Sequence, residues 1–185
     1  MILETKRLIL RPWEETDAEE CFKYSKDPRV GLPCGWAAHT DVEYSRRIIR
    51  EILAVPETYA MVLKSTGLPV GSISLHFDTD LTDKENECEM GYWIGVPYWG
   101  QGLTPEAANE LLRHAFCDLG VTTVFAGYFE GNLKSRRVQE KCGFKFRWAS
   151  DDVPVPALGE SRKGYVTAVT KEEWESLNGR SANAD

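Results

Sequence analysis

The stretch PYWGQGLTPE at residues 97–106 decides how the rest of the chain is interpreted. Gly100 and Gly102 let the backbone turn sharply and come close to a ligand. Thr104 suits the N-cap of a helix, and Pro105 suits its first position. Since free amides and the helix dipole meet at such a helix start, the sequence predicts an anion site there, and a pyrophosphate is its expected guest.

The local motif matches neither of two common nucleotide-binding loops. A P-loop carries Lys-Ser or Lys-Thr directly after its last glycine, and no such pair follows Gly102. A dinucleotide-binding loop carries a third small residue where this chain has Pro105. On the motif alone, a tight strand-to-helix turn without any ligand remains an alternative.

A strand is predicted before this loop and a helix after it. Residues 87–96 alternate between apolar and polar side chains, which is typical of a strand. Apolar residues recur at helical spacing from Ala108 to Leu119, and Gly120 ends the helix. His114 falls outside that apolar stripe and is predicted to face solvent.

The remaining pattern mixes strands and helices. Further strands are predicted over residues 8–11, 59–63, 70–77, 123–129, 144–148 and 165–169. Capping boxes predict helices that start at Thr16, Thr40 and Thr170, and Asn132 is predicted to open a short helix to about Cys142. Loops are predicted over residues 28–39 and 151–160. This order predicts an α+β (mixed α/β) fold in one domain over residues 1–178, followed by a disordered tail at 179–185.

Composition limits the possible functions. The chain has 185 residues, of which 42% are hydrophobic, enough for one compact core. No apolar run reaches the roughly 20 residues that a membrane helix needs, and no signal peptide is apparent, so we expect a cytoplasmic protein that does not bind membranes. The five cysteines show no CxxC pair, which argues against a disulfide framework and a metal site. A net charge of −7 disfavours nucleic-acid binding and suits a cationic acceptor such as an amine.

Three further patterns accompany the glycine loop. They are EMGYWI at residues 89–94, the spacing from Asn132 to Ser135, and VQEKCGF at residues 138–144. Together with WGQGLTPEA at residues 99–107, they resemble the GNAT superfamily, and within it the group that contains the ribosomal-protein serine and alanine N-acetyltransferases. The segments at 5–12 and 170–174 are similar to the same group, so the resemblance spans nearly the whole chain.

The resemblance implies a GNAT fold and a site for acetyl-CoA. The expected fold is a mostly antiparallel twisted sheet of six to seven strands, splayed between strands 4 and 5 and flanked by about four helices. The pantetheine arm is expected along the backbone of the fourth strand, at Trp93, Ile94, Gly95 and Val96. The pyrophosphate is expected on the loop, at Gly100, Gln101, Gly102, Leu103 and Thr104. Asn132 is expected to contact the pantetheine, and Ser135 to lie near the sulfur.

Two positions depart from the family pattern. Thr104 stands where the loop usually ends in Ala or Gly. Gln139 stands where many GNAT enzymes carry a tyrosine that protonates the departing thiolate, and an amide is not an acid. Ser135 is the expected substitute, through its hydroxyl group or a bound water.

Catalysis requires a neutral amine beside the thioester. Glu89 is the candidate general base, with a surface ion pair as the alternative role. An amide of the fourth strand, at Ile94 or Val96, is expected to stabilise the oxyanion. His76 and Trp36 are candidate acceptor-site residues, and packing is the alternative for Trp36.

Several functions are compatible with these residues. The leading hypothesis is an N-acetyltransferase that uses acetyl-CoA, needs no metal and acetylates a small-molecule amine or a peptide N-terminus. A GNAT module that senses acyl-CoA without turnover is the second, and a plain α/β domain without a cofactor is the third. A monomer and a homodimer are both compatible with the sequence.

Overall fold

The computed structural model describes residues 1–181, with side chains through residue 178. The expected disordered tail begins at 179, and residues 182–185 of it lie outside the described residues.

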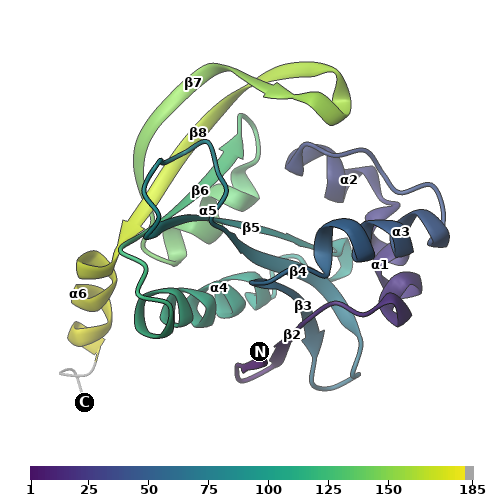
Figure 1. Cartoon of the computed structure of the whole chain (residues 1–185), viewed down its shortest axis with the longest axis horizontal. Coiled ribbons are helices and arrows are strands. Elements are labelled where there is room, and N and C mark those ends of the chain that lie inside the picture. Colours follow the sequence, from purple (N-terminus) through teal and green to yellow (C-terminus); the bar gives the residue numbers. More distant parts are fainter. Residues whose placement is uncertain (182–185) are drawn as a thin grey trace.

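Eight strands form one twisted sheet in the order β1-β2-β3-β4-β5-β6-β8-β7 (Figure 1). Neighbouring strands are antiparallel except for β5 and β6, which are parallel. The strand beyond the expected six to seven is β1, too short at two residues to show a sequence pattern. The bounds are β1 Leu3–Glu4, β2 Leu8–Arg11, β3 Thr58–Leu63, β4 Pro69–His76, β5 Glu87–Ile94, β6 Thr123–Phe129, β7 Lys145–Val155 and β8 Glu160–Thr170.

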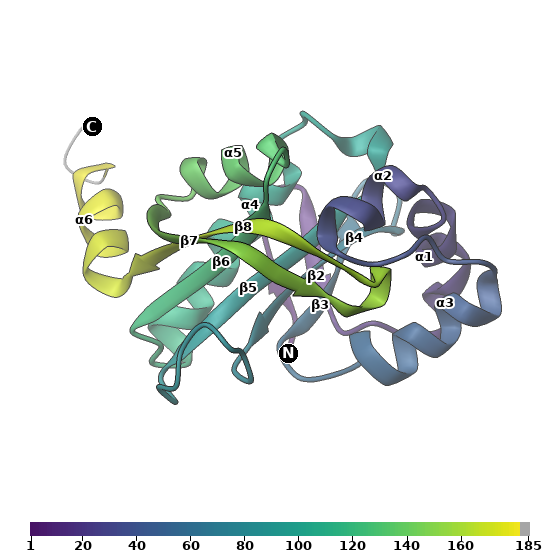
Figure 2. The same cartoon turned by 90° about the horizontal axis from the view of Figure 1, so that it is seen from above.

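Helices cover both faces of this sheet. In the described residues they are α1 Ala18–Ser25, α2 Pro28–Gly31, α3 Val42–Ile48, α4 Leu103–Arg113, α5 Leu133–Lys141 and α6 Lys171–Ser181. Figures 1 and 2 show α1, α2 and α3 grouped at one end of the sheet, with α6 at the other. Short π-helical turns extend α3 over Ile49–Leu53 and α4 over His114–Asp118.

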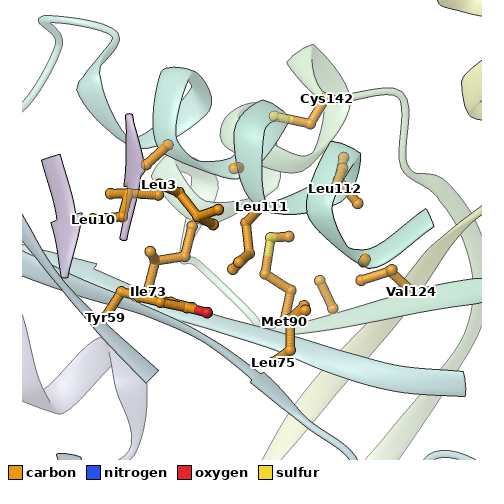
Figure 3. Packing of buried hydrophobic residues seen from close by; sticks show 14 of the residues in the cluster. Leu3, Leu10, Tyr59, Ile73, Leu75, Met90, Leu111, Leu112, Val124 and Cys142 are labelled. Atoms are coloured by element: carbon orange, nitrogen blue, oxygen red, sulfur yellow. The ribbon is translucent and has the colours of Figure 1, made fainter. Parts of the chain in front are cut away.

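The main core lies between α4 and the sheet. The predicted apolar stripe is confirmed from Ala108 to Phe116, with Leu111 and Leu112 fully buried (Figure 3), whereas Leu119 at its end is 39% exposed. They pack in one cluster with Ile73 of β4 and Met90 of β5. Truncating a buried leucine in such a core typically costs about 2–5 kcal/mol, so this stripe fixes α4 and the loop before it.

A second, smaller core lies on the opposite face, under α1 and α3. It contains Trp13, Ala18, Ile49 and Ala60 among its buried residues. In the π-helical turn that extends α3, Ile49 is fully buried in this core, whereas Ile52 is 56% exposed. A π-helical turn changes the helical period, so the residues that face the sheet are not those of a regular α-helix.

The sheet opens between β5 and β6, as expected for the fourth and fifth strands of the family fold. Their pairing covers only Glu87–Glu89 against Thr123–Phe125. Beyond this pairing, the Gly95 amide donates to the Val70 carbonyl. Because backbone groups alternate sides along a strand, the amides and carbonyls of the odd-numbered residues in this part of β5 face β4. The amides and carbonyls of Tyr92 and Ile94 therefore face the opening.

Two predicted helix starts were wrong by one or two residues. Helix α1 begins at Ala18, directly after a 3-10 turn over Glu15–Asp17, and the capping box belongs to that turn, where it joins Glu14 to Asp17. The N-cap of α3 is Asp41, whose carboxylate accepts from the Tyr44 amide at 2.7 Å. At α3 a carboxylate, which is a good cap, directly follows the expected threonine.

The third capping box is confirmed at the start of α6. The Thr170 amide donates to Glu173 at 3.0 Å, and the Glu173 amide donates to the Thr170 hydroxyl at 3.2 Å. These two bonds satisfy donors that the helix itself leaves free.

Two predicted loops contain regular structure. Within residues 28–39, Pro28 opens the short helix α2, which is capped by the Asp27 carboxylate. Residues 151–160 belong mostly to a long hairpin, because β7 continues to Val155 and β8 begins at Glu160. Pro154 is tolerated there since β7 lies at the edge of the sheet.

Candidate cofactor and catalytic site

The glycine loop turns into α4 through two residues in the left-handed conformation. Gly100 and Gly102 both have φ of 75°, a region that side chains with a Cβ rarely adopt. Gly102 is the N-cap of α4, so the prediction of Thr104 as the cap was wrong. Thr104 lies inside the first turn and is 6% exposed. The helix start is thus built from glycine backbone, which leaves amides open to a ligand.

Glu106 holds the loop against the N-terminal segment. Its carboxylate accepts from the Thr5 hydroxyl at 2.6 Å and from the Arg7 amide and side chain at 2.7 Å each. Arg7 also donates to the Gln101 carbonyl at 2.9 Å. The Gln101 side chain donates to the Pro97 carbonyl, which closes the loop on itself. Sequence analysis missed this brace because its partners are about 100 residues apart.

A cavity of about 970 Å³ connects this loop with the opening between β5 and β6. Its volume lies at the upper end of the range for small-molecule sites. Of the expected cofactor residues, Trp93, Ile94, Gly100, Gly102, Leu103, Thr104, Asn132 and Ser135 line it.

Three expected cofactor residues lie outside the cavity wall. A Cβ on Gly95 would lie 2.5 Å from the Tyr24 ring, so this glycine is needed for packing against α1. Val96 begins a 3-10 turn after the strand ends at Ile94. Gln101 is used within the loop.

The cavity wall is basic although the chain is acidic. The cations Arg29, Lys134, Arg137, Lys141 and Arg162 line it, against one carboxylate from Glu130. Arg29 and Arg162 form ion pairs with the neighbouring Asp27 and Glu160, so the positive charge comes mainly from the other three. The whole chain has a net charge of −7. Such a concentration of positive charge raises the local concentration of an anionic ligand. Of the two neighbouring arginines on α5, Arg136 forms an ion pair with Glu140 at 2.8 Å, and Arg137 lines the cavity.

Asn132 connects two segments at the cavity. Its carbonyl oxygen accepts from the Ser135 amide at 3.2 Å, which confirms Asn132 as the N-cap of α5. Its amide nitrogen donates to the Pro33 carbonyl at 3.2 Å. Next to Pro33, Cys34 lies on the cavity wall with its thiol 3.9 Å from the Tyr92 carbonyl. The Cys34 residue is exposed to solvent at this wall.

Ser135 belongs to a hydrogen-bond network that the sequence did not reveal. Its hydroxyl lies 2.9 Å from the Tyr92 hydroxyl and accepts from the Gln139 amide at 3.2 Å. Gln139 is 2% exposed; it also donates to the Gly127 carbonyl at 3.1 Å and accepts from Thr167 at 2.9 Å. Gln139 therefore joins α5 to β6 and β8. The EMGYWI motif contains Tyr92, but its alternation alone suggested only a core side chain.

Glu89 lies at the base of the opening, outside the cavity wall. Since Cys88 and Met90 face the α4 core, Glu89 points to the other face of the sheet. One carboxylate oxygen accepts from Thr79 at 2.8 Å, and the other lies 3.8 Å from the position of a Cβ on Gly127 across the opening. Within residues 1–178 Glu89 forms no ion pair, so the surface ion pair is not its role in this structure.

The expected acceptor residues occupy that same face. His76 is exposed, lies directly opposite Glu89 in the β4–β5 register and hydrogen-bonds to Ser74 at 2.8 Å. Trp36 packs edge-on against Trp93 at 6.1 Å between ring centroids. Glu89 and His76 are thus neighbours, whereas Trp36 belongs to an aromatic cluster.

The described residues contain no group of His, Cys, Asp or Glu side chains that could hold a metal ion. None of the helices in residues 1–181 is long and apolar enough to cross a membrane.

The sequence from residue 7 to residue 145 matches the family model of the acetyltransferase (GNAT) domain. The chain belongs to the GNAT acetyltransferase family. The residues that match include the glycine loop, β5 and α5, which together form most of the cavity wall. This GNAT chain is an acetyltransferase.

Relatives of this GNAT chain agree with that assignment. It is 28% identical over 178 residues to the uncharacterized N-acetyltransferase p20 of Bacillus licheniformis, covering 93% of this chain and 97% of the relative. It is 24% identical to the [ribosomal protein uS5]-alanine N-acetyltransferase of Escherichia coli, covering 91% and 78% of the two chains. Among solved structures, Mycobacterium smegmatis RimJ in complex with CoA-disulfide superposes with a TM-score of 0.75 at 19% identity, over 97% and 95% of the chains.

Proposed function

We propose that this protein transfers the acetyl group of acetyl-CoA to a primary amine by direct attack of the amine on the thioester. The observation that carries the proposal is the basic cavity, which joins a glycine-built helix start to the opening in the sheet. These residues fit the cofactor: the left-handed glycines leave room for a pyrophosphate, and the open edge of β5 offers backbone groups to an extended pantetheine. When bound, acetyl-CoA supplies the activated acetyl group.

The residues around the opening support a direct transfer. The amides of Tyr92 and Ile94 face the opening, where either can donate to a developing oxyanion. The Glu89 carboxylate, on the face of the sheet opposite the α4 core, is the proposed acceptor of the proton that the amine loses. Holding the amine and the thioester on opposite sides of one narrow opening replaces a bimolecular encounter with an intramolecular one.

The acceptor is a peptide N-terminus or a small-molecule amine. A relative named as a [ribosomal protein uS5]-alanine N-acetyltransferase favours a peptide N-terminus as the acceptor. The negative net charge of the chain suits either acceptor, because both are cations before they lose a proton.

Thermal melting with acetyl-CoA, NAD and ATP tests the cofactor. A ligand at about one hundred times its Kd stabilises a fold by about 2.7 kcal/mol, which raises Tm by about 5–10 °C in a domain of this size. We expect this rise with acetyl-CoA and not with the other two. If acetyl-CoA does not raise Tm, the glycine loop is only a strand-to-helix turn that binds no ligand.

Release of free CoA thiol on addition of amines distinguishes an enzyme from a sensor module. The sensor is the alternative because Gln139 stands where many GNAT enzymes carry an acidic tyrosine. Turnover with peptides or small amines excludes the sensor. Tight CoA binding without turnover across a broad panel of amines would support the sensor.

Glu89→Gln tests the base. The amide retains an acceptor for Thr79 but cannot take a proton, so kcat should fall about 100-fold with the Kd for acetyl-CoA unchanged. Glu85→Gln, on the exposed loop nearby, is the matched control. Equal turnover of Glu89→Gln and the control at every pH would remove Glu89 from this role.

A further inference from the structure

Tyr92 brings a phenol hydroxyl to the place where the sulfur is expected. It extends from β5 across the opening to α5, and both Tyr92 and Ser135 line the cavity. The Tyr92 oxygen lies 3.1 Å from the Ser135 carbonyl and 2.9 Å from the Ser135 hydroxyl. Within residues 1–178, Tyr92 is the one tyrosine whose hydroxyl group hydrogen-bonds to α5.

The partners constrain the direction of these hydrogen bonds. A carbonyl only accepts, so Tyr92 donates its proton to the Ser135 carbonyl. Gln139 donates to the Ser135 hydroxyl oxygen, which leaves the Ser135 proton available, and the Tyr92 oxygen at 2.9 Å is an acceptor within its reach. Both amide protons of Gln139 are used, one of them on Gly127, which leaves Gln139 nothing to offer a sulfur. The hydroxyl protons of Tyr92 and Ser135 are therefore the two protons near this point that a sulfur could receive as hydrogen bonds.

We propose that Tyr92 is a further catalytic residue, which together with Ser135 donates a hydrogen bond to the sulfur as the carbon–sulfur bond breaks. The inference rests on the proposed function. In the step, the nitrogen–carbon bond forms, the carbon–sulfur bond breaks and sulfur leaves with the electron pair as a thiolate. The proton of the amine goes to Glu89, and the hydroxyls of Tyr92 and Ser135 turn from their present acceptors to the thiolate.

The magnitudes favour hydrogen bonding over proton transfer. Burial raises the pKa of Tyr92 above its ordinary value, and the hydrogen bond from Ser135 offsets only part of that rise. An ordinary thiol has a pKa of about 8.5 and an ordinary tyrosine about 10, so moving the Tyr92 proton onto sulfur is uphill. The thiolate therefore takes its proton from solvent later. Hydrogen bonds to a charged group are about twice as strong as neutral ones, which makes the donation itself useful.

A purely structural role predicts a different outcome. If the bond to Ser135 only braced β5 against α5, loss of the hydroxyl would lower thermal stability or CoA affinity. It would not change how readily the bound thiol ionises. The thiol pKa of CoA bound to the protein, measured by the ultraviolet absorbance of its thiolate, separates the two roles.

The experiment compares Tyr92→Phe with Tyr128→Phe. Tyr128 lies on β6, the other side of the opening, and is outside the cavity wall. We expect Tyr92→Phe to raise the bound thiol pKa by about one unit and to lower kcat about tenfold, while the Kd for CoA stays within about twofold. Tyr128→Phe should leave all three at the wild-type values.

Ser135→Ala removes the second hydroxyl donor and leaves the bond from Tyr92 to the backbone carbonyl of residue 135 in place. It gives a second measurement if Tyr92→Phe does not fold. It should raise the thiol pKa by a similar amount, and the double variant should raise it further than either single variant, because each hydroxyl donates its own hydrogen bond. An unchanged thiol pKa in both variants overturns the role of Tyr92, even if stability falls. A wild-type protein that binds no CoA overturns the proposed function and this inference together, whereas an active wild type with an equally active Tyr92→Phe overturns the inference alone.

Discussion

At the scale of single residues, His114 stands out because it is fully buried between two carboxylates. Its ring nitrogens lie 3.1 Å from Glu57 and 2.8 Å from Asp118. Glu57 also accepts from the Tyr59 hydroxyl at 2.8 Å, so the network joins α4 to the start of β3. We expected His114 to face solvent, since it lies off the apolar stripe. A polar residue in that position is buried here because it finds partners on both sides.

His114→Ala should lower the free energy of unfolding by about 2–4 kcal/mol, because it leaves a cavity and removes a hydrogen-bond partner from both carboxylates. Urea denaturation measures this loss. Cys117→Ala, three residues away and exposed, should change stability by less than about 0.5 kcal/mol. A similar effect of the two substitutions would show that the network contributes nothing net.

His39 makes stability depend on pH. Burial lowers its pKa to about 4 in the folded chain, whereas an unfolded histidine titrates at about 6.5. Between these two pKa values the unfolded state binds more protons than the folded state. The free energy of unfolding is therefore unaffected by His39 above pH about 6.5, and protonation of His39 in the unfolded state lowers it as the pH falls toward 4. Unfolding of His39→Asn and wild type, compared over this range, should give a shallower fall for the variant. Parallel profiles would mean that other groups cause the acid sensitivity.

At the scale of elements, the loop before α4 depends on glycine backbone. Gly102→Val should cost about 1–3 kcal/mol, since a β-branched residue at a φ of 75° is strained. It should also weaken CoA binding at least tenfold, because the new side chain enters the anion cradle. Isothermal titration and thermal melting measure the two effects.

Gly120→Val is the matched control for that substitution. Gly120 has φ of 72° with open space around it and ends the same helical segment far along the chain from the loop. Its variant should be destabilised by a similar amount with an unchanged Kd for CoA. Equal loss of affinity in both variants would indicate that strain, and not the filled cradle, weakens binding.

Most elements were predictable because their signals are local. The alternation over 87–96, the stripe from Ala108 and the N-cap Asn132 each express a contact within one element. The β7–β8 hairpin was missed because Pro154 and Pro156 argue for a loop when the edge position of β7 is unknown. The Glu106 brace and the bond from Tyr92 to α5 join segments far apart in sequence, so no local pattern reveals them.

At the scale of the whole molecule, charge is unevenly distributed, with a basic cavity in a chain of net charge −7. Salt screens such an attraction, since the Debye length falls from about 10 Å at 0.1 M to about 3 Å at 1 M. The Kd for CoA should therefore rise severalfold over that range. Pantetheine, which lacks the phosphates, should bind with little dependence on salt. Equal salt dependence of the two ligands would show that the lining cations do not act on the phosphates.

A sheet that opens in its middle has four edges instead of two. β5 and β6 share only the short register from Glu87 to Glu89, and beyond it both strands present unpaired backbone inside the molecule. Exposed strand edges are templates for pairing with foreign extended chains. A ligand that fills this opening hides both inner edges at once. Protection from aggregation is then coupled to the supply of that ligand, so the protein persists best in cells where its donor is abundant.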